Sequence, residues 1–102
     1  MSVYVDRVNI RFGRMVMCHL IADTADELHA MADRIGVARK WFQDTSKASF
    51  PHYDIALTKK AIAIAAGAIE CDRATFVAHV RRLRPVWGVY GPGNPAPPRS
   101  EQ

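Results

Sequence analysis

Apolar and polar positions in the first third of the chain predict two strands and a helix. Residues 15–22 form a near-continuous apolar run of strand length, which is typical of a central strand covered on both faces. Residues 3–6 are rich in strand-forming side chains, whereas residues 7–13 predict a loop. A helix is predicted between Thr24 and Gly36, because it has a capping box, a C-terminal glycine and an apolar stripe made of Leu28, Met31, Ala32 and Ile35.

The pattern of the remaining chain predicts two more strands and two more helices. Residues 37–43 alternate in a way that favours a strand, and residues 52–56 favour a short one. Thr58 is a suitable N-cap for a helix over 59–66. Residues 73–84 predict a last helix that ends at Pro85 and buries Phe76, Val77, Val80 and Leu83.

The order β-β-α-β-(β)-α-α predicts a small single-domain α/β fold, with a mixed sheet of three or four strands and about three helices. Residues 15–43 are expected to form one right-handed strand–helix–strand crossover. The domain is expected to span residues 1–87. Residues 88–102 are rich in proline and glycine and predict a flexible tail.

Composition places the chain among ordinary globular proteins, with 102 residues, of which 49% are hydrophobic and 24% charged. No apolar run approaches the ~18 residues of a membrane-spanning helix, and the N-terminus lacks a signal pattern. We therefore expect a cytoplasmic protein with no membrane partner. Cys18 and Cys71 lie in apolar surroundings typical of reduced, buried thiols, and a disulfide between them is the open alternative.

A net charge of +4 is modest, and its distribution matters more than its size. Arginines gather near both ends of the body, and clustering in the fold would let them attract phosphate. Without a dense basic run, a solvated basic surface is the more ordinary interpretation. The arginines in question are Arg7, Arg11, Arg14, Arg81, Arg82 and Arg84.

Residues 50–54 carry the most distinctive chemistry in the chain. Alternate side chains of an extended segment share a face, so His52 and Asp54 are expected to project together while Tyr53 points the other way. An imidazole and a carboxylate on one face can orient each other, bind a metal or move a proton. His19 is a further candidate, although a histidine in an apolar strand is more often a hydrogen-bonded core residue.

A second group of residues points to ligand binding. Arg39, Trp41 and Gln43 would share one strand face, where they could stack on a base, although a strand tryptophan is usually core. Lys59 lies at a predicted helix N-terminus, where a bound anion would offset its unfavourable position. Arg14 and Tyr53 complete the candidate ligand-binding set.

Several blocks of the sequence, spread over residues 3 to about 70, form a distinctive combination. They are Val3-Tyr4-Val5-Asp6, Gly13-Arg14, residues 18–24, Glu27-Leu28-His29, Ile35-Gly36, Trp41-Phe42-Gln43, Pro51-His52-Tyr53-Asp54 and Ala66-Gly67-Ala68. Together these blocks resemble the DUF4031 family of small bacterial and phage proteins of unknown function. The resemblance implies a cytosolic bacterial or phage context, with the polar residues of these blocks forming a site.

Two function classes therefore stay open. The favoured one is a ligand-binding module for a nucleotide or nucleic-acid phosphate. The alternative is a small metal-dependent hydrolase or nuclease-like enzyme in which His19, His52 and Asp54 hold a divalent metal or act as acid and base, with Asp6 assisting. Whether the protein is an enzyme stays open at this point, and an exposed edge strand would suit a homodimer.

Overall fold

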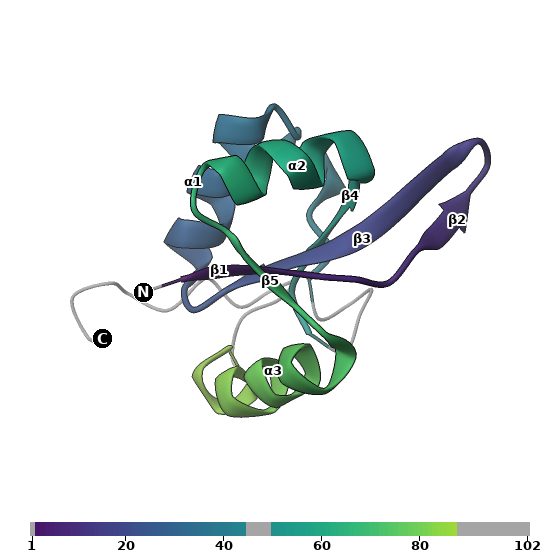
Figure 1. The fold of residues 1–102 in the computed structure, drawn as a ribbon. Helices are drawn as coiled ribbons and strands as arrows, with labels where there is room; N and C mark the ends of the chain where they lie inside the picture. The colour runs from purple at the N-terminus through teal and green to yellow at the C-terminus, as the bar shows by residue number, and fades with distance from the viewer. Residues whose placement is uncertain (1, 45–49, 88–102) are drawn as a thin grey trace.

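A computed structural model of the chain describes residues 2–44 and 50–87 (Figure 1). In these ranges the strands are β1 (Val3–Asp6), β2 (Ile10–Phe12), β3 (Met15–Ala22), β4 (Tyr53–Ala56) and β5 (Ile69–Cys71). The helices are α1 (Ala25–Ile35), the short 3₁₀ helix η1 (Arg39–Trp41), α2 (Leu57–Ala65) and α3 (Arg73–Trp87).

Strand β3 lies at the centre of a mixed five-stranded sheet. Leu20 pairs with Val5 of β1 and also with Tyr53 of β4, so these two strands flank β3 on opposite edges. Met17 likewise pairs with both β2 and β4, which places β2 on the same edge as β1. Strand β5 then adds to β1 in parallel, while the other pairings are antiparallel.

Helices cover both faces of this sheet, with α1 and α2 on one face and α3 on the other (Figure 1). Thr24 caps α1 by accepting a hydrogen bond from the Glu27 amide, and Gly36 ends the helix with a left-handed φ of 81°. The most deeply buried side chains come from β1, β3, β4 and α1, and they include Val5, Leu20, Ile21, Leu28, Tyr53 and Ile55.

The α/β class with a mixed sheet is confirmed, with more strands than predicted. The predicted loop at 7–13 contains β2, and the chain between α2 and α3 contains β5. Both strands have three residues, too few to show an alternating pattern. Helix α2 begins at Leu57 with no side-chain cap, so Thr58 does not have the predicted capping role.

The predicted strand over residues 37–43 is wrong, because η1 occupies its middle. Val37 and Phe42 are the residues that pack against the core, and a spacing of five cannot place both on one face of a strand. Trp41 is 60% exposed instead of buried. The predicted crossover over 15–43 is therefore also wrong, since the parallel pair of the sheet is β1 with β5.

The remaining expectations about the chain have mixed outcomes. Both cysteines are buried and unpaired, as predicted, and burial raises the pKa of the Cys18 thiol to about 12. Helix α3 continues through Pro85 to Trp87, beyond its predicted end. The predicted tail over 88–102 lies outside the described residues. No helix in the described ranges is both long and apolar enough to cross a membrane.

A polar clamp made of Tyr4, Asp23, His79 and Arg82 fastens α3 to the sheet. The Arg82 guanidinium donates hydrogen bonds to Asp23 Oδ1 at 3.0 Å and to the Tyr4 hydroxyl at 3.1 Å. The Tyr4 ring stacks on His79 with 3.9 Å between ring centroids. Burial acts to raise the pKa of Asp23, but the hydrogen bonds from Arg82, Tyr4 and the Ser2 amide outweigh it and hold that pKa below its ordinary value.

We predict that Asp23→Asn lowers the free energy of unfolding by about 1 kcal/mol at neutral pH. Because folding lowers the pKa of Asp23, its contribution is fully present above the ordinary aspartate pKa and is lost as the pH falls through the lower, folded value. The difference between wild type and variant should therefore shrink below about pH 4. Urea denaturation at several pH values measures it.

Asp33→Asn is the matched control, because its ion pair with Arg39 at 3.4 Å is exposed on both sides. It should change the free energy of unfolding by less than about 0.5 kcal/mol. A difference between wild type and Asp23→Asn that does not vary with pH would contradict the role of the carboxylate charge in the clamp.

Candidate metal centre

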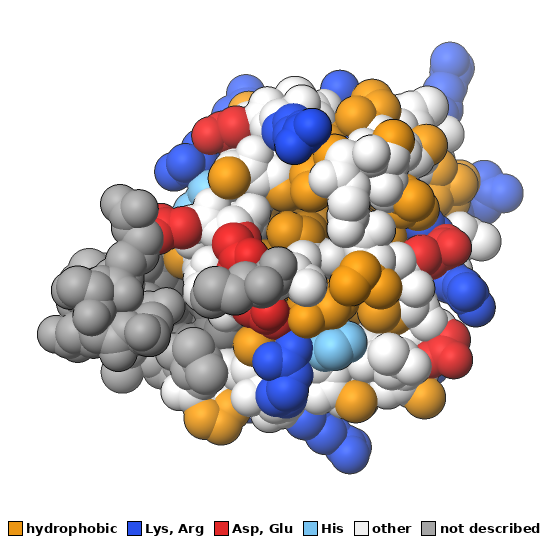
Figure 2. Space-filling model, turned by 60° about the vertical axis from the view of Figure 1, so that its left-hand side comes forward, with side chains coloured by type: hydrophobic (Ala, Val, Ile, Leu, Met, Phe, Trp, Pro, Cys, Tyr) orange, Lys and Arg blue, Asp and Glu red, His pale blue; other side chains and the backbone are white. Residues whose placement is uncertain are grey.

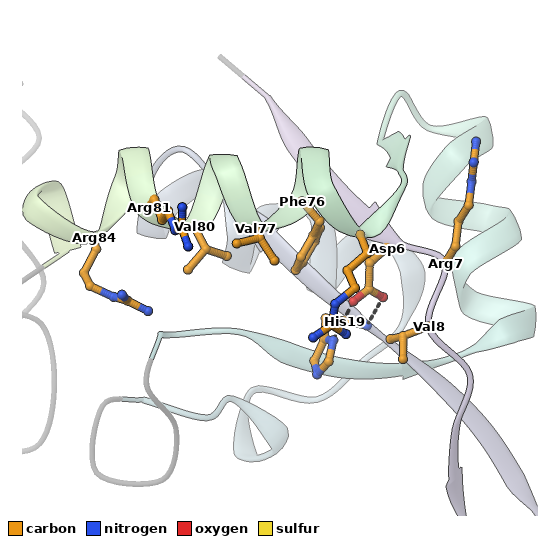
Figure 3. Close-up of a pocket in the computed structure, with 10 residues that line it drawn as sticks. Asp6, Arg7, Val8, His19, Phe76, Val77, Val80, Arg81 and Arg84 are labelled. Atoms are coloured by element: carbon orange, nitrogen blue, oxygen red, sulfur yellow. Dashed lines mark hydrogen bonds and ion pairs between the residues drawn. The ribbon is translucent and has the colours of Figure 1, made fainter.

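His19 is fixed on the α3 face of the sheet by Asp6. In the β1–β3 register Asp6 follows the last pair, Val5 with Leu20, so it lies across from His19. Its carboxylate accepts a hydrogen bond from the His19 backbone amide at 2.9 Å and contacts the ring Nδ1 at 2.6 Å (Figure 3). This contact places a proton on Nδ1 and leaves Nε2 directed away from Asp6.

Strand β4 brings Asp54 and His52 to the same place. Asp54 is the cross-strand partner of His19, and its Oδ1 lies 3.7 Å from His19 Nε2. His52 is two residues earlier on the same face, with its Nε2 3.3 Å from Asp54 Oδ1. The prediction that His52 and Asp54 project together is confirmed, and the buried Tyr53 points to the α1 face, where its hydroxyl contacts His29.

Hydrogen bonds with the Phe50 carbonyl and the Gln43 side-chain amide orient the His52 ring and the Asp54 carboxylate. The Phe50 carbonyl lies 2.8 Å from His52 Nδ1, and because a carbonyl only accepts, that nitrogen carries the proton. Gln43 forms a bridge with His52 through two backbone hydrogen bonds and donates its side-chain amide to Asp54 Oδ2 at 2.6 Å. Asp54 Oδ1 is buried and has no hydrogen-bond partner among the residues that the structure describes.

Three potential ligand residues therefore converge, because His19, His52 and Asp54 each have one ligand atom within 4.8 Å of those of the other two. Ligand atoms bound tetrahedrally at about 2.1 Å from a metal lie roughly 3.4 Å apart. The two distances to Asp54 Oδ1, 3.3 and 3.7 Å, are close to that spacing. Two of the three distances therefore suit a metal centre with two imidazoles and one carboxylate, and the third is at most 4.8 Å.

The pKa shifts favour an ionised Asp54 carboxylate and a His19 imidazole that binds a proton more readily than usual. His52 is the largest cause of the lowered pKa of Asp54; burial opposes it, and the hydrogen bond from Gln43 adds to it. The hydrogen bond to Asp6 raises the pKa of His19 against the effect of burial. Side chains of His19, His52 and Asp54 are 32%, 14% and 31% exposed, so the cluster lies near the surface of the fold, although Asp54 Oδ1 itself is buried.

Of the residues predicted from sequence, five meet in this cluster: Asp6, His19, Gln43, His52 and Asp54. The other candidate ligand-binding residues lie on separate parts of the fold. Arg14 is in the turn between β2 and β3, Arg39 and Trp41 are on η1, Tyr53 faces α1, and Lys59 is on α2.

Two contributors to the cluster gave no signal in the sequence. The Phe50 carbonyl is a backbone group, so its role cannot be read from a residue type. Phe76 was predicted only as a core residue of α3, yet its ring lies against the His19 imidazole with 6.1 Å between centroids. Both depend on how distant segments pack.

Comparison with known proteins gives a family but no activity. Neither the curated proteins nor the solved structures include a match to this chain. A family model described as a protein of unknown function, DUF4031, matches residues 3–83, so the match covers the sheet and continues into α3. The chain thus belongs to the DUF4031 family.

Proposed function

We propose that this protein is a small metal-dependent hydrolase that binds one divalent transition-metal ion through His19, His52 and Asp54. The observation that carries the proposal is the convergence of three ligand atoms within 4.8 Å. Each imidazole has its other nitrogen held by an acceptor, Asp6 for His19 and the Phe50 carbonyl for His52. That arrangement is typical of histidines that bind a metal.

The buried carboxylate oxygen supports the same conclusion. Asp54 Oδ1 is buried and has no hydrogen-bond partner among the described residues. His52 Nε2 lies 3.3 Å from this oxygen, while Nδ1 of the same ring is held by the Phe50 carbonyl. A cation bound by Nε2 and Oδ1 would satisfy the buried oxygen.

The ligand set supports catalysis more than a structural role. Structural zinc sites usually have four protein ligands, whereas three protein ligands leave a position for water or substrate. Imidazole and carboxylate ligands suit zinc, manganese, iron and nickel. Such an ion lowers the pKa of bound water and polarises the bond that is cleaved. The side chains of His19, His52 and Asp54 are partly exposed, which supports access of water and substrate to this position.

The alternative of a nucleotide-binding module built on Arg14, Arg39, Trp41 and Lys59 has less support. These side chains lie on three separate parts of the fold. Gln43, which the sequence predicts to bind the same ligand, instead donates a hydrogen bond to Asp54. The hydrolase proposal uses residues that share one site.

We predict that the purified protein, incubated with zinc, manganese, nickel or ferrous iron and then desalted, retains about one ion per chain. His52→Ala and Asp54→Asn should each weaken metal affinity by more than about 100-fold, because each removes a ligand atom. Elemental analysis and chelator competition measure both effects. His79→Ala is the control, since His79 lies in the clamp with Tyr4 and should leave metal binding unchanged. Equal metal retention by His52→Ala would contradict the site.

Asp6→Asn should weaken metal affinity by about 10- to 100-fold while leaving all three ligands in place. The amide cannot supply the negative charge that makes His19 a better electron donor. Chelator competition on the folded variant, with circular dichroism as a check of fold, gives the value. An unchanged affinity would mean that Asp6 only positions the strand.

Metal-loaded protein should hydrolyse at least one activated ester among 4-nitrophenyl phosphate, bis(4-nitrophenyl) phosphate and 4-nitrophenyl acetate. His52→Ala should reduce the rate by at least about 100-fold, and His79→Ala should not. Release of 4-nitrophenol is followed by absorbance. Stoichiometric metal without turnover of any of these esters would refute the hydrolase and leave a metal-binding protein.

A further inference from the structure

A groove of about 600 Å³ opens beside His19, between α3 and the sheet. Figure 3 shows Asp6 and His19 at one end, with Phe76, Val77 and Val80 following α3 towards Arg81 and Arg84 at the other end. Its volume is within the range of sites that hold small organic ligands. His19, one of the three proposed metal ligands, therefore lines one end of the groove, whereas His52 and Asp54 are not among the lining residues.

The wall that α3 contributes is apolar between Arg73 and Arg81. Phe76 is almost fully buried and packs on the His19 ring, while Val77 and Val80 are partly exposed along the groove. An aromatic ring and two branched side chains make a surface suited to the apolar body of a ligand.

Positive charge gathers at the groove without matching negative charge. Arg73, Arg81 and Arg84 line it, are exposed, and form no hydrogen bond or ion pair with any residue in the described ranges. Asp6 is the one acidic residue among the lining residues, and it is engaged with His19. Arg7 also lines the groove, but it pairs with Glu70 at 3.8 Å, and its side chain points away in Figure 3. The charge favours an anionic ligand.

The spacing along α3 defines the size of that ligand. Arg81 and Arg84 are three residues apart, so they lie on the same side of the helix and can contact one anion together. At 1.5 Å per residue, Arg84 is about 12 Å along the helix from Phe76, which packs on His19. Two guanidinium groups with several donors each match the oxygens of a phosphate.

We propose that the groove binds a phosphate-bearing organic substrate. Its phosphate contacts Arg81 and Arg84, its apolar body lies on Phe76, Val77 and Val80, and its reacting group reaches the His19 end. The placement of the reacting group rests on the proposed metal site, whereas phosphate binding does not. The phosphate can belong to a mononucleotide-sized molecule or to a single nucleic-acid strand, which share this chemistry.

The test uses metal-free full-length protein in EDTA, so that it is independent of the metal centre. Adenosine 5′-monophosphate, adenosine and a single-stranded ten-residue oligothymidylate are titrated separately, with amide chemical shifts and calorimetry as readouts. We expect the monophosphate or the oligonucleotide to shift amides over residues 76–84, and adenosine to bind at least about 10-fold more weakly than the monophosphate. Arg81→Ala/Arg84→Ala should reduce phosphate binding by at least about 10-fold.

Matched variants make the result specific. Arg11→Ala/Arg34→Ala removes the same charge from β2 and α1 and should bind the phosphate probes as wild type does. Arg81→Lys/Arg84→Lys keeps the charge and should restore part of the affinity. Equal binding of adenosine and its monophosphate, or equal losses in the two double alanine variants, would overturn the proposal.

Two further comparisons identify the source of the phosphate and test the groove separately from the metal centre. Tighter binding of the oligonucleotide than of the monophosphate identifies a strand as the source of the phosphate, and the reverse identifies a small molecule; both outcomes support the groove. His52→Ala should bind the phosphate probes normally in EDTA. If the wild type binds no metal and still binds phosphate through Arg81 and Arg84, the metal centre fails and the groove stands.

Discussion

The register of β3 is the constraint on which the site depends. This strand pairs with β1 on one edge and β4 on the other, and both pairings include Leu20. The neighbouring position, His19, therefore has Asp6 on one side and Asp54 on the other. Because side chains alternate, a slip of one residue in either ladder would move one of these carboxylates to the opposite face of the sheet.

Helix α3 connects this row of side chains to the groove. One side of the helix is held by the clamp of Tyr4, Asp23, His79 and Arg82, which fixes its position on β1. Phe76 lies against His19, and the side with Arg81 and Arg84 faces the groove. The clamp is separate from the proposed ligands, so α3 can position the groove without taking part in metal binding.

Sequence reasoning succeeded where the information was local. A period of two was enough to place His52 and Asp54 on one face, and the caps and stripe of α1 were visible in its own residues. The prediction failed at residues 37–43. Residues alternate there as they do in a strand, but Val37 and Phe42 both pack against the core, which the backbone of a strand would not allow. His19 could be named as a candidate, but its convergence with Asp54 depends on pairing across more than thirty residues of chain. Arg81 and Arg84 could be named from the sequence as part of an arginine group, whereas Arg73 could not, and only the docking of α3 gives the three a common surface.

The two acceptors behind the histidines differ in charge, and this has a consequence for the whole centre. Asp6 brings one negative charge to His19, the Phe50 carbonyl brings none to His52, and Asp54 supplies the second negative charge directly. A divalent ion bound there would be neutralised by these two carboxylates. The loaded centre would then have little long-range attraction for an anion, so capture and alignment of an anionic substrate would be the task of α3. Substitutions on α3 could then change which substrate is recognised without altering His19, His52 and Asp54, the residues that would bind the reactive ion.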